Sequence, residues 1–310
     1  MIAWLCRLLF WWKRPAALAP QPVASLTRLE RIILTDGVAR TLFEDYAEHR
    51  RSARGHEEIG WVLLGLRQGD EAIALAALPA GTSRDAGAAH VQFDAEAQGL
   101  ASRIVRQRDK RLQILGVVHT HPGDLREPSD GDLHGDSRWV GALRGGEGVF
   151  AIGTADAHSN EAAGAHVQRL GDLCFCWYAL GVGERRYRTL PVQVTLGPDL
   201  AQRIRTVWAV IESNTKALEY LCRLFAKVEF DILNDDPDNL LAVKISLAES
   251  GQQIRLLLST AEARYYWERD GEVIAIDPRE EDLVRAVFLI LAELAKEDAQ
   301  ITETPTFVES

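Results

Sequence analysis

Residues 116–132 read Gly-Val-Val-His-Thr-His-Pro-Gly-Asp-Leu-Arg-Glu-Pro-Ser-Asp-Gly-Asp. The apolar start of this stretch predicts a β-strand, which Pro122 ends because proline has no N–H to donate to a neighbouring strand. Successive side chains on a strand point to opposite faces, so His119 and His121 point the same way, about 7 Å apart along the strand. That arrangement lets two imidazoles bind one metal ion.

Two polar residues follow the loop after the strand. Asp132 is a third candidate ligand, and Ser129 lies three residues before it. Two His and one carboxylate form an open zinc site in which a fourth position is left for water. Zinc can lower the pKa of water to about 7, which makes hydroxide available at neutral pH.

Amide hydrolysis also needs a general base. Glu58 is the candidate, because it begins an apolar strand, where a carboxylate is costly unless it is used or paired. Glu57 is the rival base, one residue further from the apolar run. Ser129 can donate a hydrogen bond to the oxyanion of a tetrahedral intermediate, and the alternative for Ser129 or Asp130 is a helix N-cap. Five more potential ligands are more simply interpreted as solvated loop residues, and the alternative is that one of them is a hydrogen-bond partner of the metal ligands: Asp124, Glu127, Asp130, His134 and Asp136.

Apolar periodicity predicts an α/β (α+β) domain over residues 25–195, a mixed sheet with helices packed on it. Strands are expected over residues 29–34, 58–65, 71–78, 91–93, 112–119, 149–153, 174–180 and 187–194. Helices are expected over residues 36–51 and 95–110, and from Asp130 or Asp132 to about Leu143.

A different pattern follows Gly197-Pro198. We expect a helix over residues 199–228, four strand-like runs, a helix over residues 281–296, and a frayed polar tail over residues 298–310. The four runs cover residues 228–233, 240–247, 253–258 and 264–276, the last bent at residues 269–271. Residues 196–310 are therefore predicted to form a smaller α-ββββ-α accessory domain. This part contains no His, so the chemistry is expected in the first domain.

Composition narrows the choice of partners and compartment. A formal net charge of −10 argues against a nucleic-acid partner, since nucleic-acid binders usually carry a basic face. The four cysteines show neither a disulfide framework nor paired C-x-x-C spacing, which favours a reducing, cytoplasmic location: Cys6, Cys174, Cys176 and Cys222. Cys174 and Cys176 lie in one apolar run and are expected to be buried on one face of a strand.

The first 12 residues are almost wholly apolar and rich in Trp. A membrane-spanning helix needs about 20 apolar residues, so this segment is too short to cross a bilayer. Pro and Ala follow it without a convincing signal-peptide cleavage site, so residues 1–24 are predicted to be an apolar segment and a linker. Two interpretations stay open for residues 1–14: contact with protein, whether this chain or a partner, and peripheral contact with a membrane.

His119-Thr-His121-Pro122, followed by Ser129 and Asp132, resembles the JAMM motif of the JAB/MPN/Mov34 metalloprotease family. Residues 58–65 are similar to that family's catalytic-glutamate strand, and the resemblance covers about residues 25–195. Trp61 stands where many relatives have a small residue, which predicts a bulkier floor near the catalytic glutamate. The resemblance implies a Zn²⁺ site held by His119, His121 and Asp132, with Glu58 as general base and Ser129 as oxyanion stabiliser.

The resemblance also implies a reaction, namely cleavage of isopeptide or peptide bonds at the C-terminal tail of ubiquitin or a ubiquitin-like protein. Bacterial relatives of this shape are similar to deubiquitinase-like partners of ubiquitin-activating-like and ubiquitin-conjugating-like proteins, or to enzymes that trim sulfur-carrier proteins. The order of elements in residues 196–310 is similar to ubiquitin-conjugating or RWD folds in topology only, without an active-site Cys in the right region. Two alternatives are a partner-recruiting scaffold that retains its zinc site, and a zinc amidohydrolase acting on a small molecule.

Overall fold

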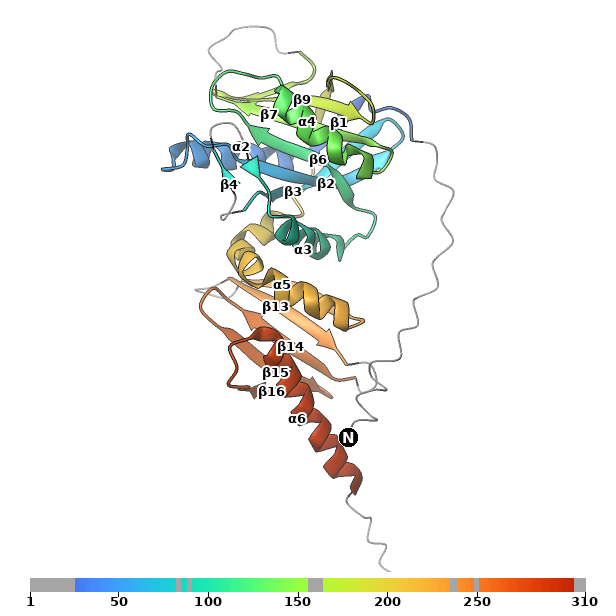
Figure 1. Ribbon diagram of the computed structural model, residues 1–310, viewed down its shortest axis with the longest axis vertical. Helices are drawn as coiled ribbons and strands as arrows, with labels where there is room; N and C mark the ends of the chain where they lie inside the picture. Colours follow the sequence, from blue (N-terminus) through green and yellow to red (C-terminus); the bar gives the residue numbers. More distant parts are fainter. Residues whose placement is uncertain are drawn as a thin grey trace, which may run out of the picture.

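The computed structural model describes residues 26–81, 85–87, 91–155, 164–234, 239–247 and 251–303. Two sheets organise these residues along the long axis of the molecule, with α3 (Ala95–Arg106) and α5 (Trp208–Leu224) between them (Figure 1). The predicted apolar segment and linker, residues 1–24, lie outside the described residues. Among the described helices, none is long and apolar enough to span a bilayer.

The larger sheet has nine strands in the order β10-β9-β7-β6-β2-β3-β1-β11, with β8 paired to β9. The pairs β1–β3, β1–β11 and β6–β7 are parallel and the others antiparallel, so the predicted mixed sheet is confirmed. A two-stranded ribbon, β4 (Asp85–Ala86) and β5 (Val91–Gln92), stands apart from it. The strands are β1 (Arg31–Thr35), β2 (Gly60–Gln68), β3 (Glu71–Pro79), β6 (Gln113–Thr120), β7 (Glu147–Thr154), β8 (Val167–Leu170), β9 (Leu173–Gly181), β10 (Arg188–Thr189) and β11 (Val192–Thr195).

Helices pack on both faces of the larger sheet. On one face, α2 (Asp36–Arg51) begins where the Thr35 side chain accepts a hydrogen bond from the Val38 backbone N–H, and buries Leu42 and Phe43. On the other face, α3 begins where Asp94 accepts from the backbone N–H groups of residues 96 and 97. A helix start leaves backbone N–H groups unpaired, and the Thr35 and Asp94 side chains each accept hydrogen bonds from such groups. Both helix starts could therefore be predicted from the sequence.

The smaller sheet has five strands in the order β12-β13-β14-β15-β16, so the prediction of four was wrong. Residues 264–276 form a hairpin rather than a bent strand, because Asp270 (φ 51°) and Gly271 (φ 87°) take the positive φ angles of a two-residue turn. Both α5 and α6 (Leu283–Glu303) pack on one face of this sheet. The strands are β12 (Val228–Asn234), β13 (Asn239–Ser246), β14 (Gln253–Leu258), β15 (Ala263–Arg269) and β16 (Glu272–Ile276).

Two predicted helix boundaries in this half of the chain were also wrong. A 3₁₀ turn, η2 (Gln202–Val207), precedes α5, so the expected single helix over residues 199–228 is divided. Asp199 explains the late start, because its carboxylate accepts from the backbone N–H groups of Ala77 and Ala201 and so binds the chain to β3. The tail expected to fray from residue 298 continues α6 to Glu303.

The chain segment that connects the two sheets is hydrogen-bonded to the first domain. The Leu200 N–H donates to the Leu75 carbonyl at 2.9 Å, and the Thr35 hydroxyl donates to the Pro198 carbonyl at 2.9 Å. Apolar side chains of α3 and α5 belong to one core that continues into the second sheet.

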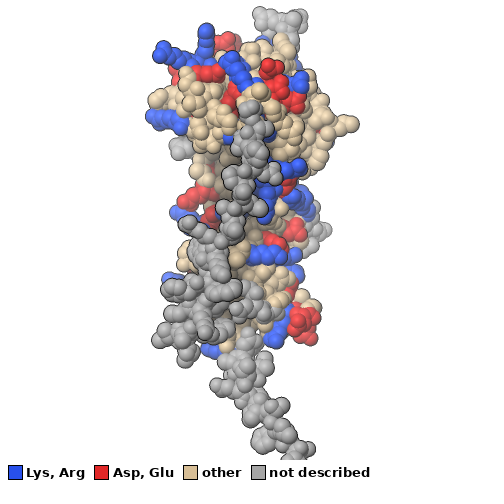
Figure 2. Space-filling model, turned by 90° about the vertical axis from the view of Figure 1, so that its right-hand side faces the viewer, with Lys and Arg blue, Asp and Glu red and all other residues tan. Residues whose placement is uncertain are grey.

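One side of the molecule shows Lys and Arg interspersed with Asp and Glu (Figure 2).

Candidate metal centre

His119 lies on β6, in the interior of the larger sheet, and His121 follows directly after the end of that strand. His119 is opposite Gly60 of β2 on one side and Ile152 of β7 on the other. The His121 backbone N–H donates to the Gly153 carbonyl at 2.8 Å, which extends the pairing with β7 past the end of the strand. The backbone that carries both imidazoles is therefore fixed from both sides before any ligand binds.

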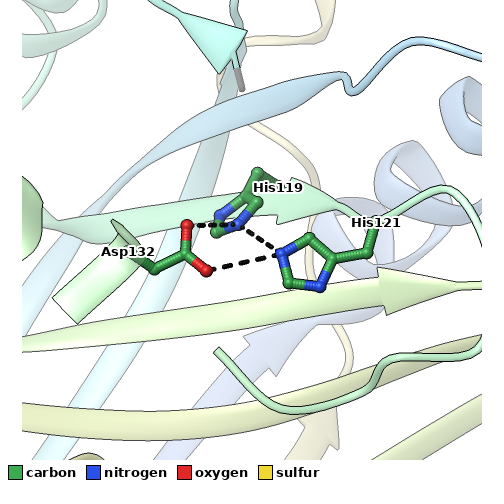
Figure 3. A group of neighbouring side chains, drawn as sticks. All are labelled: His119, His121 and Asp132. Atoms are coloured by element: carbon green, nitrogen blue, oxygen red, sulfur yellow. Dashed lines mark hydrogen bonds and ion pairs between the residues drawn. The ribbon is translucent and has the colours of Figure 1, made fainter. Parts of the chain in front are cut away.

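His119, His121 and Asp132 bring three ligand atoms together (Figure 3). The two Nε2 atoms of the histidines are 3.1 Å apart. Asp132 Oδ1 is 3.1 Å from His119 Nε2, and Asp132 Oδ2 is 3.4 Å from His121 Nε2. The three residues that the sequence selected as ligands are thus within reach of one ion.

The donor set and its spacing fit zinc. Two atoms that each lie about 2.0–2.1 Å from a tetrahedral zinc ion are about 3.3 Å from one another. The separations of 3.1, 3.1 and 3.4 Å are close to that value. Two imidazole nitrogens and a carboxylate oxygen also suit zinc chemically. Both histidines are buried, so a metal would be bound away from bulk water.

A hydrogen bond orients His121 for this role. Its Nδ1 lies 2.9 Å from the backbone carbonyl of Leu125. A carbonyl can only accept, so Nδ1 carries the hydrogen and the lone pair of a neutral ring is on Nε2, which faces Asp132. Backbone carbonyls leave no trace in a residue pattern, which is why the part played by Leu125 could not be predicted.

Asp132 is positioned by the start of α4 (Asp130–Trp139), whose N-cap is Ser129. The Ser129 backbone N–H donates to Asp132 Oδ2 at 2.6 Å, and the Ser129 hydroxyl donates to the same oxygen at 2.8 Å. In return the Asp132 backbone N–H donates to the Ser129 hydroxyl at 3.2 Å. The capping alternative for Ser129 is therefore what the structure shows, and its role as oxyanion stabiliser stays a prediction.

The ionisable side chains of this centre shift one another's pKa values. For Asp132, burial alone would raise the carboxyl pKa, but hydrogen bonds from His119 and His121 hold it well below its ordinary value. For His121, burial alone would lower the pKa, but the hydrogen bonds to Asp132 and to the Leu125 carbonyl and the charges of Asp132 and Glu58 raise it overall. Protons and a metal cation would therefore compete for these side chains.

Glu58 belongs to this centre, although it lies outside the strands. Its side chain is only 4% exposed, and its charge is among those that raise the pKa of His121. The Glu58 backbone N–H donates to the Gly87 carbonyl at 2.8 Å, and the Ile59 N–H donates to the Thr120 hydroxyl at 3.1 Å. Glu57, the rival base, forms an ion pair of 2.6 Å with Arg54. Of the two candidates, Glu58 is the one that interacts with a predicted metal ligand.

The expectation that Trp61 makes the floor near Glu58 bulkier was wrong. Side chains alternate along β2, and Trp61 faces the core beneath α2, where its Nε1–H donates to Asp45 at 2.9 Å. Gly60 faces the same side as His119, and a Cβ atom at Gly60 would lie 2.8 Å from the ring of Phe93. The absent side chain at Gly60 therefore makes room for Phe93 beside the centre.

Asp136 lies one turn after Asp132 on α4, and the sequence favoured a solvated loop residue there, with a hydrogen-bond partner of the metal centre as the alternative. Its carboxylate accepts hydrogen bonds from the Tyr187 hydroxyl at 2.7 Å and from Trp139 Nε1–H at 3.2 Å. Burial raises the pKa of Asp136 to about 6, against the effect of those bonds and of His119. No side chain of α4 is fully buried, so these bonds help to hold the helix that carries Asp132. Tyr187 is far away in the sequence, and no local signal pointed to it.

The remaining candidate ligands stay outside the centre. Among the described residues, the only cluster of His, Cys, Asp and Glu with metal-ligand spacing is His119, His121 and Asp132. Four of the other candidate ligands are exposed and lie outside this cluster: Asp124, Glu127, Asp130 and His134.

A comparison with protein families matches the part of the chain that carries this centre. A family model described as prokaryotic homologs of the JAB domain matches residues 39–170, which include all five predicted site residues. Residues 39–170 match the JAB domain family. The chain also has some likeness to the solution structure of protein DSY2949 from Desulfitobacterium hafniense, at 18% identity and a TM-score of 0.36, covering 54% of this chain and 94% of that one. No curated protein matches the sequence.

The JAB family includes hydrolytic metalloproteases as well as inactive members. In this JAB domain the three ligand atoms converge and a buried carboxylate lies near them. The centre is therefore complete in residue types for a metal-dependent hydrolase.

Replacing Tyr187 with Phe is expected to weaken zinc binding about tenfold, the lower end of what outer hydrogen-bond partners of metal sites usually contribute. The change removes the hydroxyl that holds Asp136 and so loosens α4 beneath Asp132. Competition with a chromogenic chelator measures the affinity. Tyr265→Phe, in the second sheet, is the matched control and should leave the affinity unchanged. Equal affinities for wild type and Tyr187→Phe would contradict the role of this contact.

The metal-free JAB domain is expected to lose stability as pH rises from 6 to 8. A histidine whose folded pKa is raised contributes stability that is full below its unfolded value of about 6.5 and is lost as pH rises through the folded pKa. His121 is such a group. Urea unfolding with a chelator present should therefore show a larger difference between wild type and His121→Gln at pH 6 than at pH 8. A difference that grows with pH would contradict the assignment.

Proposed function

We propose that this protein is a zinc-dependent isopeptidase or peptidase that cleaves at the C-terminal tail of a ubiquitin-like protein or its conjugates. The observation that carries the proposal is the convergence of His119, His121 and Asp132 beside the buried Glu58. A scaffold has no need for a buried carboxylate next to three metal ligands, because burying such a charge is costly. A hydrolase needs one as its general base.

Each residue of the centre has its own role in the proposed reaction. His119, His121 and Asp132 would hold the ion, and zinc bound there would supply Lewis-acid chemistry, acidifying water and polarising a carbonyl group. Glu58 takes a proton from the attacking water and returns it to the leaving amine. The position of Glu58 suits both steps, because the residue is buried beside His121 and can hold a proton away from bulk water. Ser129 keeps Asp132 in place through two hydrogen bonds.

Ser129 is also the proposed donor to the oxyanion, and this role requires its hydroxyl to turn. The Ser129 hydroxyl donates to Asp132 Oδ2, which already accepts the Ser129 backbone N–H. If Asp132 loses electron density to a bound cation, the hydroxyl hydrogen is less strongly held there and becomes available to a second acceptor. The capping function would then persist through the backbone N–H alone.

A protein tail suits this centre better than a small molecule does. The loop after β6 is exposed, and Leu125 in it presents 55% of its surface beside His121. An extended tail of small residues can form backbone hydrogen bonds as an added strand and leaves no bulky side chain to accommodate. Partners such as ubiquitin-activating-like or ubiquitin-conjugating-like proteins would then make the conjugates on which the enzyme acts.

Hydrolysis of defined substrates tests the proposal. The zinc-loaded chain is incubated with a ubiquitin-like protein fused at its C-terminus to a reporter, with the same reporter on an unrelated unstructured tail, and with small acyl-amide substrates. We expect cleavage after the ubiquitin-like tail only. Cleavage of the small amides alone would indicate a small-molecule amidohydrolase, and stoichiometric zinc without cleavage of any substrate would indicate a scaffold.

A further inference from the structure

The second sheet has an apolar area on the face that α5 and α6 do not use. Along β13, Leu241 and Val243 point into the shared core, so Leu240 and Ala242 point the other way. Ala242 is paired with Leu257 of β14, which shares that orientation. Together with Leu233 and Tyr266 these residues form a separate cluster, here called the outer patch: Leu233, Leu240, Ala242, Leu257 and Tyr266.

Three members of the outer patch are buried although they face away from α5 and α6. The exposed fractions are 2% for Leu240, 1% for Ala242 and 9% for Leu257. In Figure 1 α6 crosses one face of this sheet, and the apolar side chains of both α5 and α6 belong to the core on that face. No helix of the described ranges belongs to the cluster on the outer face. An apolar segment packed on this face would keep these side chains from water.

The chain itself supplies a segment of that kind. Residues 1–12 contain three Trp, three Leu, one Ile and one Phe, and only Arg7 is charged among their side chains. The described chain begins at Leu26, in the first domain, so residues 13–25 connect the segment to it. Thirteen extended residues reach at most about 45 Å, whereas a small domain is about 30 Å across, so the connection is long enough to pass from one domain to the next.

We propose that residues 1–12 pack on the outer patch of the same chain and cover it. Large aromatic side chains bury much apolar surface at a small cost in conformational freedom, and they suit a shallow sheet face that offers Ala242 between larger neighbours. Arg7 can remain at the edge, where Asp231, on the same face of β12, is half-exposed. The segment then acts as a strap from the first domain to the second, and its apolar surface is not available to a membrane.

Crosslinking in the full-length chain tests the proposal, because Cys6 lies inside the segment. Cys222 is replaced by Ser, and Cys174 and Cys176 are buried and can stay. A single cysteine is then placed on the outer face at Lys244 or at Asp231, as Lys244→Cys or Asp231→Cys. Lys216→Cys, exposed on α5, is the matched control on the helix side. Each variant is treated with a short bis-maleimide at low protein concentration.

We expect both outer-face variants to give a crosslinked product of monomer mass, at least tenfold faster than the control. A product of dimer mass would overturn the proposal, because the segment would then cover a second copy. Crosslinking no faster than the Lys216→Cys control would overturn it as well. Repeating the reaction with vesicles of phosphatidylcholine and phosphatidylserine provides the last arm, since loss of the product there would identify a membrane anchor instead.

Discussion

The Glu58→Gln variant should bind zinc as tightly as the wild type and lose about 10²–10⁴-fold in kcat, the usual contribution of a general acid–base group. Gln has nearly the same shape as Glu, so the buried site keeps its packing, and Glu58 is not among the three ligand residues. What disappears is the group that accepts and returns the proton. Single-turnover hydrolysis of the ubiquitin-like fusion, measured alongside metal content, separates the two effects.

Glu57→Gln is the matched control for this result. The residue is adjacent in sequence and has the same chemistry, but its carboxylate is bound to Arg54. We expect its kcat to stay within about threefold of the wild type, because a solvated surface pair contributes little even to stability. If Glu57→Gln lost activity and Glu58→Gln kept it, the base would have to be reassigned.

The parts of this centre that are local in the chain were predictable. His-x-His on an apolar strand fixes both imidazoles on one face, and the short interval to Asp132 limits where the third ligand can go. The capping box at Ser129 follows from the same interval, because N-cap and N3 residues are three apart. Glu58 was selected by a different argument, the cost of burying a carboxylate, and it is buried.

What could not be predicted depends on contacts between distant segments. Tyr187 holds Asp136 across 51 positions, and the carbonyl of Leu125 orients His121 through the backbone. The face of the sheet to which the Trp61 side chain points depends on the register of β2 against β6. A shift of one residue in that register would have turned the side chain to the opposite face. The missed hairpin at Asp270-Gly271 was a different kind of error, since Asp-Gly between two apolar runs is a strong signal for a tight turn.

Adding zinc to the metal-free protein should raise its free energy of unfolding by about 2.7 kcal/mol at a free concentration 100 times the dissociation constant, and by about 4.1 kcal/mol at 1,000 times. The gain arises because only the folded chain brings His119, His121 and Asp132 together. At a fixed zinc concentration the gain should grow with pH, since zinc must displace the protons that His121 holds and its dissociation constant therefore falls as pH rises. Urea titrations at pH 6 and pH 8, with and without zinc, measure both effects.

Asp132→Asn should remove most of that gain, whereas Asp130→Asn, in the first turn of the same helix, should leave it intact. Both changes remove one negative charge near the start of α4, so any influence of the helix dipole is lost in either variant. Only Asp132 lies within 3.4 Å of both imidazoles, and an amide is a far weaker zinc ligand than a carboxylate. Equal zinc stabilisation in the two variants would show that the ion is held elsewhere, and hydrolysis would then have to be explained without this centre.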